Sequence, residues 1–121
     1  LARTGAEAID MVVVNLYPFK QTVAKPDVTP EMARTNIDIG GPCMVRASAK
    51  NYLRVASVTD PADYQSIIDE LNANDATLGI ETRFRLMRKA FRHTADYDTA
   101  IASFFASALP ETIKATYDFQ D

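Results

Sequence analysis

The chain has 121 residues, which is enough for one domain with a single hydrophobic core. Hydrophobic residues make up 47% of it, a proportion that excludes a largely disordered protein. Its 13 basic and 16 acidic side chains leave a net charge of -3, so the composition gives no reason to expect a nucleic acid or a membrane surface as the partner.

The N-terminal segment indicates a truncated or processed chain. Its first ten residues, LARTGAEAID, resemble the end of an element that starts further upstream, and the first residue is Leu1 rather than methionine. The segment lacks the pattern of a signal peptide, and no apolar run in the chain approaches the roughly 20 residues of a membrane span. A single cysteine cannot form an internal disulfide, so a reducing compartment, the cytoplasm, is expected.

The first predicted strand begins at Met11. The sequence MVVVNLYPF begins with a methionine and three β-branched valines, which is typical of a strand buried on both faces. Pro18 then leads the chain into a loop. Further along, Thr29 and Pro30 are a helix cap and a first-turn proline. A short helix is therefore expected over 30–36.

A turn containing GGP separates that helix from the next predicted elements. Helix-forming residues dominate 43–52, and 54–60 returns to the composition of a strand. Asp60 and Pro61 again provide a cap and a first-turn proline. The helix that follows has the most regular apolar stripe of the chain. Its members are Tyr64, Ile67, Ile68 and Leu71.

The C-terminal third is predicted to be helical. After a polar connection over 72–79, an apolar stripe starts at Ile80 and continues to Phe91. Residues 94–96 are expected to break or bend this helix, and a last helix would then end at Pro110.

Two buried strands separated by helices predict an α/β fold, in which a parallel sheet is flanked by helices and followed by a helical C-terminal third. Two strands alone rarely make a stable open sheet, because their edges and faces need neighbours. We therefore expect further strands upstream of this chain or in a partner.

Ligands of such folds bind beyond the carboxyl ends of the strands. Asn15 and Tyr17 follow the first strand there. Gly40 and Gly41 precede a helix whose positive end would favour a negatively polarised ligand oxygen. The alternative for the glycines is a turn that only suits the backbone, and the alternative for Tyr17 is a packing role.

Asp38 and Lys50 are a second candidate for chemistry. They would meet if the glycine turn folded the following helix back beside residues 37–39. A carboxylate next to an ammonium can transfer a proton near neutral pH, because the carboxylate favours the charged lysine and burial favours the neutral one. The alternative is a structural salt bridge.

Three further features have structural interpretations. His93, the single histidine, is expected to be structural or to cap a helix. Cys43 is expected to be a small buried residue. The basic run at 83–93 indicates the solvated face of an amphipathic helix or a subunit contact. No cluster of Cys and His predicts a metal site.

A series of motifs resembles one family. They are NLYPF, IDIGGP with the following MVRASAKN, the junction VASVTDPADY, then ETR, KAF and HTADYDTAI. The family comprises bifunctional purine-biosynthesis enzymes that combine aminoimidazole carboxamide ribonucleotide (AICAR) transformylase with IMP cyclohydrolase. The resemblance implies a methylglyoxal-synthase-like fold. It identifies residues 1–121 as the C-terminal two-thirds of the cyclohydrolase domain, without the transformylase domain.

The resemblance also implies an activity, the dehydration of formyl-AICAR to IMP, with neither a metal nor an organic cofactor. Lys50 matches the family's acid/base lysine, Asp38 matches the aspartate that acts with it, and Tyr17 matches an active-site tyrosine. The residues that match nucleotide-contacting segments are Val14, Asn15, Ile39, Gly40 and Gly41.

The chain departs from the family pattern in two respects. It lacks the phosphate-binding segments of the domain's N-terminal half, and it carries Cys43 and Tyr52 where serine and histidine are common. We therefore expect the chain to need an upstream segment of the same domain for activity, and the resemblance implies a homodimer. The alternative from another class is a non-catalytic methylglyoxal-synthase-like module that senses a nucleotide or a phosphate.

Overall fold

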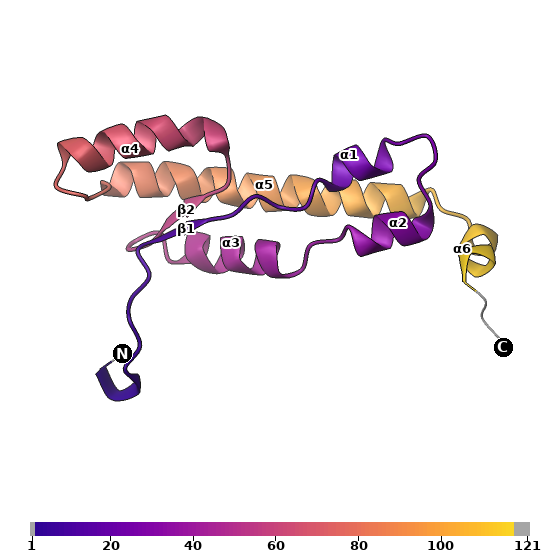
Figure 1. Cartoon of the computed structure of the whole chain (residues 1–121), viewed down its shortest axis with the longest axis horizontal. Helices are drawn as coiled ribbons and strands as arrows, with labels where there is room; N and C mark the ends of the chain where they lie inside the picture. Colours follow the sequence, from indigo (N-terminus) through magenta and orange to yellow (C-terminus); the bar gives the residue numbers. More distant parts are fainter. Residues whose placement is uncertain (1, 118–121) are drawn as a thin grey trace.

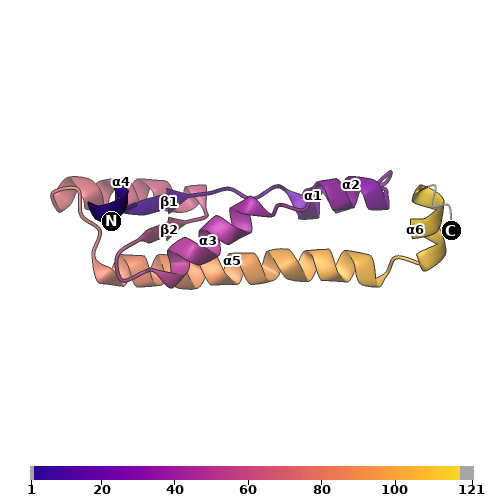
Figure 2. The same cartoon turned by 90° about the horizontal axis from the view of Figure 1, so that it is seen from below.

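One long helix, α5, runs along most of the molecule, and the other elements are arranged beside it (Figure 1). The computed structural model describes residues 2–117. Seen from the second direction, α5 lies on one side and β1 lies with α1, α2 and α4 on the other, while β2 and α3 lie between them (Figure 2). The elements in chain order are η1 (Ala2–Thr4), β1 (Met11–Val13), α1 (Phe19–Val23), α2 (Pro30–Thr35), α3 (Gly40–Lys50), β2 (Ala56–Val58), η2 (Pro61–Asp63), α4 (Tyr64–Ala73), α5 (Ile80–Ala106) and α6 (Pro110–Thr116).

The described residues contain a two-stranded parallel sheet, in which Met11 lies opposite Ala56 and Val13 lies opposite Val58. Helix α3 packs on both strands, and α5 packs on β2. The predicted α/β fold, with parallel strands flanked by helices, is confirmed. The predicted burial of the first strand on both faces is not confirmed, because Val13 is 51% exposed. Strand β2 is buried throughout.

Side-chain caps start two of the helical segments as predicted. The Thr29 hydroxyl accepts a hydrogen bond from the Met32 N–H at 3.1 Å, and α2 begins at Pro30. The Asp60 carboxylate accepts from the Ala62 N–H at 2.9 Å ahead of η2 and α4. Each cap satisfies one of the backbone donors that a helix start leaves without an internal partner.

Helix α5 contributes one buried residue to each of three hydrophobic clusters, namely Leu86, Ala90 and Tyr97. Thr94 lies on the same buried stripe and donates its hydroxyl hydrogen to the Phe91 carbonyl at 3.2 Å. The predicted break at 94–96 is therefore wrong, because this polar residue is satisfied inside the helix and does not interrupt its apolar face.

Two short helices go beyond the prediction. Helix α1 follows Pro18 and buries Phe19. Helix α6 begins at Pro110, the residue that was expected to end a helix, because proline fits a first helical turn, where its missing N–H is not needed. Among residues 2–117, no helix combines the length and hydropathy that crossing a membrane requires.

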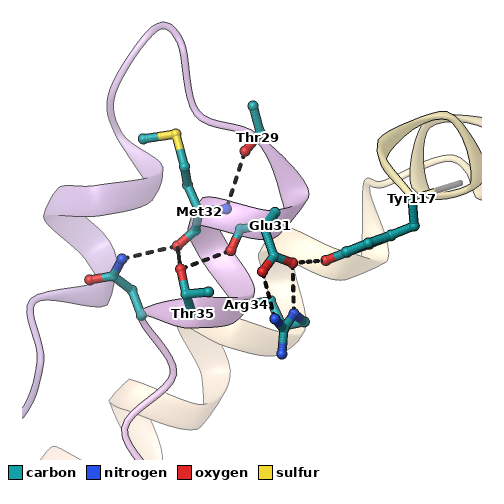
Figure 3. A network of polar contacts seen from close by, with 7 residues as sticks. Thr29, Glu31, Met32, Arg34, Thr35 and Tyr117 are labelled. Atoms are coloured by element: carbon teal, nitrogen blue, oxygen red, sulfur yellow. Dashed lines mark hydrogen bonds and ion pairs between the residues drawn. The ribbon is translucent and has the colours of Figure 1, made fainter.

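The C-terminal helix is tied to α2 by a charged cluster (Figure 3). Arg34 binds the Glu31 carboxylate through two nitrogens, at 2.5 and 2.7 Å, and the Tyr117 hydroxyl donates to the same carboxylate. These hydrogen bonds, that of Arg34 first, lower the pKa of Glu31 from 4.5 to about 2. The same carboxylate raises the pKa of Tyr117, so the phenol stays protonated as a donor.

Attachment of the Tyr117 segment to α2 should weaken in acid. The pKa of Glu31 is lower in the folded chain than in the unfolded one, so its contribution is complete above about pH 4.5 and is lost as the pH falls towards 2. The ring resonances of Tyr117, followed by NMR, should move over this range in the wild type. They should stay constant in Glu31→Gln, and the same titration in both proteins would contradict the prediction.

Candidate active site

The carboxyl ends of β1 and β2 open onto two adjoining hollows. The first has a volume of about 290 Å³, near the lower end for pockets that hold small ligands. Both hollows contain Thr59, which follows β2, and His93 and Asp96, which α5 provides. The first is also lined by Asn15, Leu16, Tyr17, Pro18, Phe19, Lys20, Gln21 and Tyr97.

The Asp38 carboxylate joins two segments at this position. One oxygen accepts a hydrogen bond from the Gly41 N–H at 2.8 Å, and the other accepts from the Tyr17 N–H at 3.2 Å. The loop after β1 is thereby fastened to the first turn of α3. This approach is so close that a Cβ on residue 41 would lie 2.5 Å from an Asp38 oxygen and 2.8 Å from a methyl of Leu16.

Tyr97 holds the backbone of the same turn. Its hydroxyl accepts a hydrogen bond from the Asp38 N–H at 2.9 Å and donates to the Asn36 carbonyl at 3.1 Å. Burial raises the pKa of this phenol, which keeps it a donor. The Tyr97 side chain received no role in the sequence-based predictions beyond its place in the motif HTADYDTAI. The one signal available was that a buried tyrosine needs a partner for its hydroxyl.

A compact ion-pair group lies beside the second hollow. Lys89 contacts the carboxylates of Asp60 and Asp63, both at 2.7 Å, and Arg85 contacts Asp63 at 3.1 Å. Hydrogen bonds to Asp60 and Asp63 raise the pKa of Lys89, and its hydrogen bond to Asp60 lowers the pKa of that carboxyl. The basic run of 83–93 is therefore only partly a solvated face.

His93 lies on the wall of both hollows, where a role towards a ligand is open to it. The prediction that His93 is structural or caps a helix did not include a position on the wall of a hollow. Cys43 is exposed, so its prediction as a small buried residue is wrong. The reason is that the buried side of α3 is formed by other residues, namely Gly41, Val45, Ser48 and Ala49.

The structure does not bring Asp38 and Lys50 together within this chain. Gly40 and Gly41 are the first residues of α3 rather than a turn that reverses the chain, and Lys50 is its exposed last residue. Ten residues of helical rise separate the two ends of α3, about 15 Å. The expected close pair of carboxylate and ammonium is therefore corrected.

The remaining predicted site residues lie near the Asp38 end of α3 or beside the strands. The Tyr17 side chain is 57% exposed and lines the first hollow, and Ile39 is 72% exposed. The Val14 N–H continues the ladder to the Val58 carbonyl at 3.0 Å. The Asn15 amide donates to the Tyr64 hydroxyl at 3.4 Å. A Cβ on Gly40 would meet no atom within 4 Å.

Comparison with known proteins decides the family. The family model described as "AICARFT/IMPCHase bienzyme" matches residues 48–121, which is more than half of the chain. The chain belongs to the AICARFT/IMPCHase bienzyme family. The resemblance seen in the motifs is thereby confirmed.

Relatives of this AICARFT/IMPCHase chain bear the name "Bifunctional purine biosynthesis protein PurH". That of Streptococcus gordonii is 55% identical over 118 residues, and that of Ruminiclostridium cellulolyticum is 50% identical over 119 residues. Each alignment covers 94% of this chain and 23% of the relative, so the chain spans about a quarter of their length.

A solved structure supports the fold. The "Crystal structure of ForH" superposes with a TM-score of 0.77 at 33% identity, over 87% of this chain and 54% of that one. The match agrees with the methylglyoxal-synthase-like fold that the motifs implied for an AICARFT/IMPCHase chain. Within residues 2–117, no three His, Cys, Asp or Glu side chains gather as metal ligands would.

Replacing Gly41 by alanine should destabilise the protein, whereas replacing Gly40 should not. Gly41→Ala forces the Asp38 carboxylate out of its position and should lower the free energy of unfolding by about 1–3 kcal/mol. Gly40→Ala meets open space and gains helix propensity, so it should be neutral or stabilise by up to about 1 kcal/mol. Denaturant unfolding of both variants in the same full-length protein measures the difference, and equal effects would contradict the role of this close approach.

Proposed function

We propose that this chain carries part of an IMP cyclohydrolase, a hydrolase of the class that acts on cyclic amidines, which closes formyl-AICAR to IMP in the last step of de novo purine biosynthesis. Residues 1–121 would be the C-terminal two-thirds of that domain. One observation carries the proposal: the Asp38 carboxylate joins the NLYPF loop, which lines the first hollow, to the IDIGGP turn. These are the two segments with cyclohydrolase-like motifs.

The reaction forms one bond and removes one water. The carboxamide nitrogen attacks the formyl carbon, and the formyl oxygen becomes a transient oxyanion. That oxygen then leaves as water, with one proton from the carboxamide nitrogen and one from the formamide nitrogen. A protein accelerates such a step by holding the two groups in contact and by placing proton carriers and hydrogen-bond donors around the developing charge.

We assign a role in this reaction to three side chains. Lys50 transfers protons, and the Tyr17 hydroxyl donates a hydrogen bond to the developing oxyanion. Asp38 acts with them by holding the Tyr17 loop against α3. The nucleotide would be contacted by Val14, Asn15, Ile39, Gly40 and Gly41. The positive end of α3, an 11-residue helix, favours a negatively polarised ligand oxygen at the two glycines.

We also propose that an upstream segment of the same domain covers an apolar hollow beside the strands. Val13 is 51% exposed there and Ile68 is 49% exposed, which is unfavourable for large aliphatic side chains in water. An added strand on this side would also satisfy a free sheet edge. The hollow is lined by Met11, Val13, Val58, Tyr64, Ile67 and Ile68. Assembly as a homodimer in the cytoplasm is part of the same proposal.

The decisive experiment uses the complete protein that contains this sequence. The purified protein is incubated with formyl-AICAR, and IMP formation is followed by ultraviolet absorbance. We expect turnover well above the uncatalysed rate. Tight binding of IMP without turnover would instead identify a nucleotide-sensing module, and neither binding nor turnover would reject both functions. Sedimentation of the same sample tests the dimer.

A further inference from the structure

We propose that Tyr97 is a positioning residue of this site, and that its hydroxyl sets the backbone of residues 36–38 so that the Asp38 carboxylate holds both the Tyr17 loop and the first turn of α3. The inference rests on the proposed function for its catalytic consequence. Its structural part concerns contacts that exist whether or not the substrate is formyl-AICAR.

The hydroxyl of Tyr97 both donates and accepts a hydrogen bond within residues 36–38. It accepts from the N–H of Asp38 at 2.9 Å and donates to the carbonyl of Asn36 at 3.1 Å, so the peptide is held on both sides of Ile37. Asn36 is held in turn at the end of α2, where its amide donates to the Met32 carbonyl at 3.0 Å. The turn therefore has little freedom once Tyr97 is in place.

The ring of Tyr97 is fixed independently of its hydroxyl. Tyr97 is 7% exposed and Phe19 is 1% exposed, and their rings pack edge to face with centroids 6.1 Å apart. Ala33 of α2 completes the buried part of this cluster. Phenylalanine at position 97 would keep this packing and remove only the two hydrogen bonds.

Asp38 connects Tyr97 to the Tyr17 loop and to the first turn of α3. Its backbone N–H is bound to Tyr97, while its carboxylate oxygens receive the N–H groups of Tyr17 and Gly41 at 3.2 and 2.8 Å. Tyr97 itself is not expected to touch the reacting atoms, because its hydroxyl is occupied by the protein. It acts through Asp38, and a displacement of about 1 Å at such a position can cost about 10²-fold in rate.

The test compares Tyr97→Phe with Tyr52→Phe in the complete protein. Tyr52 is a matched control, because its ring also packs edge to face on another ring, that of Phe84 at 5.6 Å, and it lies outside the hollows. Tyr97→Phe should lower kcat for IMP formation about 10-fold to 100-fold at temperatures where it is fully folded, and Tyr52→Phe should leave kcat unchanged. An unchanged kcat in Tyr97→Phe would overturn the inference.

A double-mutant cycle separates positioning through Asp38 from general destabilisation. In an Asp38→Ala background, Tyr97→Phe should produce no further loss of kcat, because the carboxylate that it positions is gone. Losses that multiply in the double variant would show that Tyr97 acts independently of Asp38 and would overturn the inference.

A readout that needs no turnover distinguishes this inference from the proposed function. In Tyr97→Phe, the amides of Tyr17 and Gly41 should exchange with solvent at least about 10-fold faster. Both amides donate to Asp38 rather than to Tyr97, and this acceptor is displaced in the variant. If the wild-type protein forms no IMP, the proposed function fails and amide exchange alone decides the inference. Unchanged exchange at both amides would then reject it.

Discussion

Replacing Lys50 by alanine should lower kcat for IMP formation by about 10²–10⁴-fold, the usual contribution of a general acid or base. Ring closure requires a proton to leave each of two nitrogens and two protons to reach the departing oxygen. Lys50 is exposed at the end of α3, and it forms no salt bridge with the described residues. Its ammonium is therefore available to a ligand.

The fold should tolerate this change. Alanine is the most favourable helix residue, and the substitution removes only the interaction of a cation with the carboxyl end of a helix, about 0.3–1 kcal/mol. A large loss of kcat with nearly unchanged thermal unfolding would thus report on chemistry. Unchanged turnover of formyl-AICAR would remove Lys50 from the mechanism.

Two further variants show what Lys50 contributes. Lys50→Arg keeps the positive charge but cannot release a proton near neutral pH, so kcat should remain low while KM stays close to that of the wild type. Arg46→Ala is the control, because Arg46 is also an exposed cation of α3. Its guanidinium carbon lies over the Phe91 ring, 5.5 Å from the ring centroid. The kcat of this variant should be nearly that of the wild type.

A polypeptide limited to residues 1–121 should form no detectable IMP. Each strand of its sheet has a bonded neighbour on one edge only within the described residues, and Val13 and Ile68 are about half exposed. A chain of this size has roughly 5–15 kcal/mol of stability, so uncovered apolar surface and free sheet edges weigh heavily. The groups that bind the substrate phosphate are also expected upstream.

The experiment compares this polypeptide with the complete protein. Circular dichroism during denaturation measures folding cooperativity, and ultraviolet absorbance measures IMP formation. Adding the upstream segment as a separate polypeptide should restore activity if it docks on the apolar hollow beside β1. A cooperatively folded, fully active and monomeric 1–121 would show that the site is complete without that segment.

Local signals in the sequence predicted much of the fold. The caps at Thr29 and Asp60 were foreseeable, because the interacting atoms lie two or three residues apart. The β-branched run at Met11 and the composition around Ala56 indicated the two strands. The break expected at Thr94 was wrong, because the Thr94 hydroxyl donates a hydrogen bond to the Phe91 carbonyl inside the helix. The apolar stripe of α5 continues past this residue.

The candidate site was predictable only in outline. The segment carrying Tyr17 and the turn carrying Asp38 were expected at one end of the sheet, and the Asp38 carboxylate does join them. The bond between Asp38 and Tyr97 spans 59 residues, and no spacing rule connects positions so far apart. Lys50 was expected beside Asp38 because Gly40 and Gly41 suggested a reversal of the chain, but both glycines belong to α3.

The three clusters along α5 have a kinetic consequence. Leu86 packs with Ala56 and Val58, and Ala90 packs with residues of α3. Tyr97 packs with Phe19 and Ala33. The later a residue lies in α5, the earlier in the sequence its partners lie. Each successive cluster therefore encloses a longer loop, and loop closure costs more entropy as the loop grows. If the clusters with the shortest loops form first, folding would start at the cluster that joins α4, α5 and β2. The cluster around Tyr97, and with it the Asp38 turn, would form last.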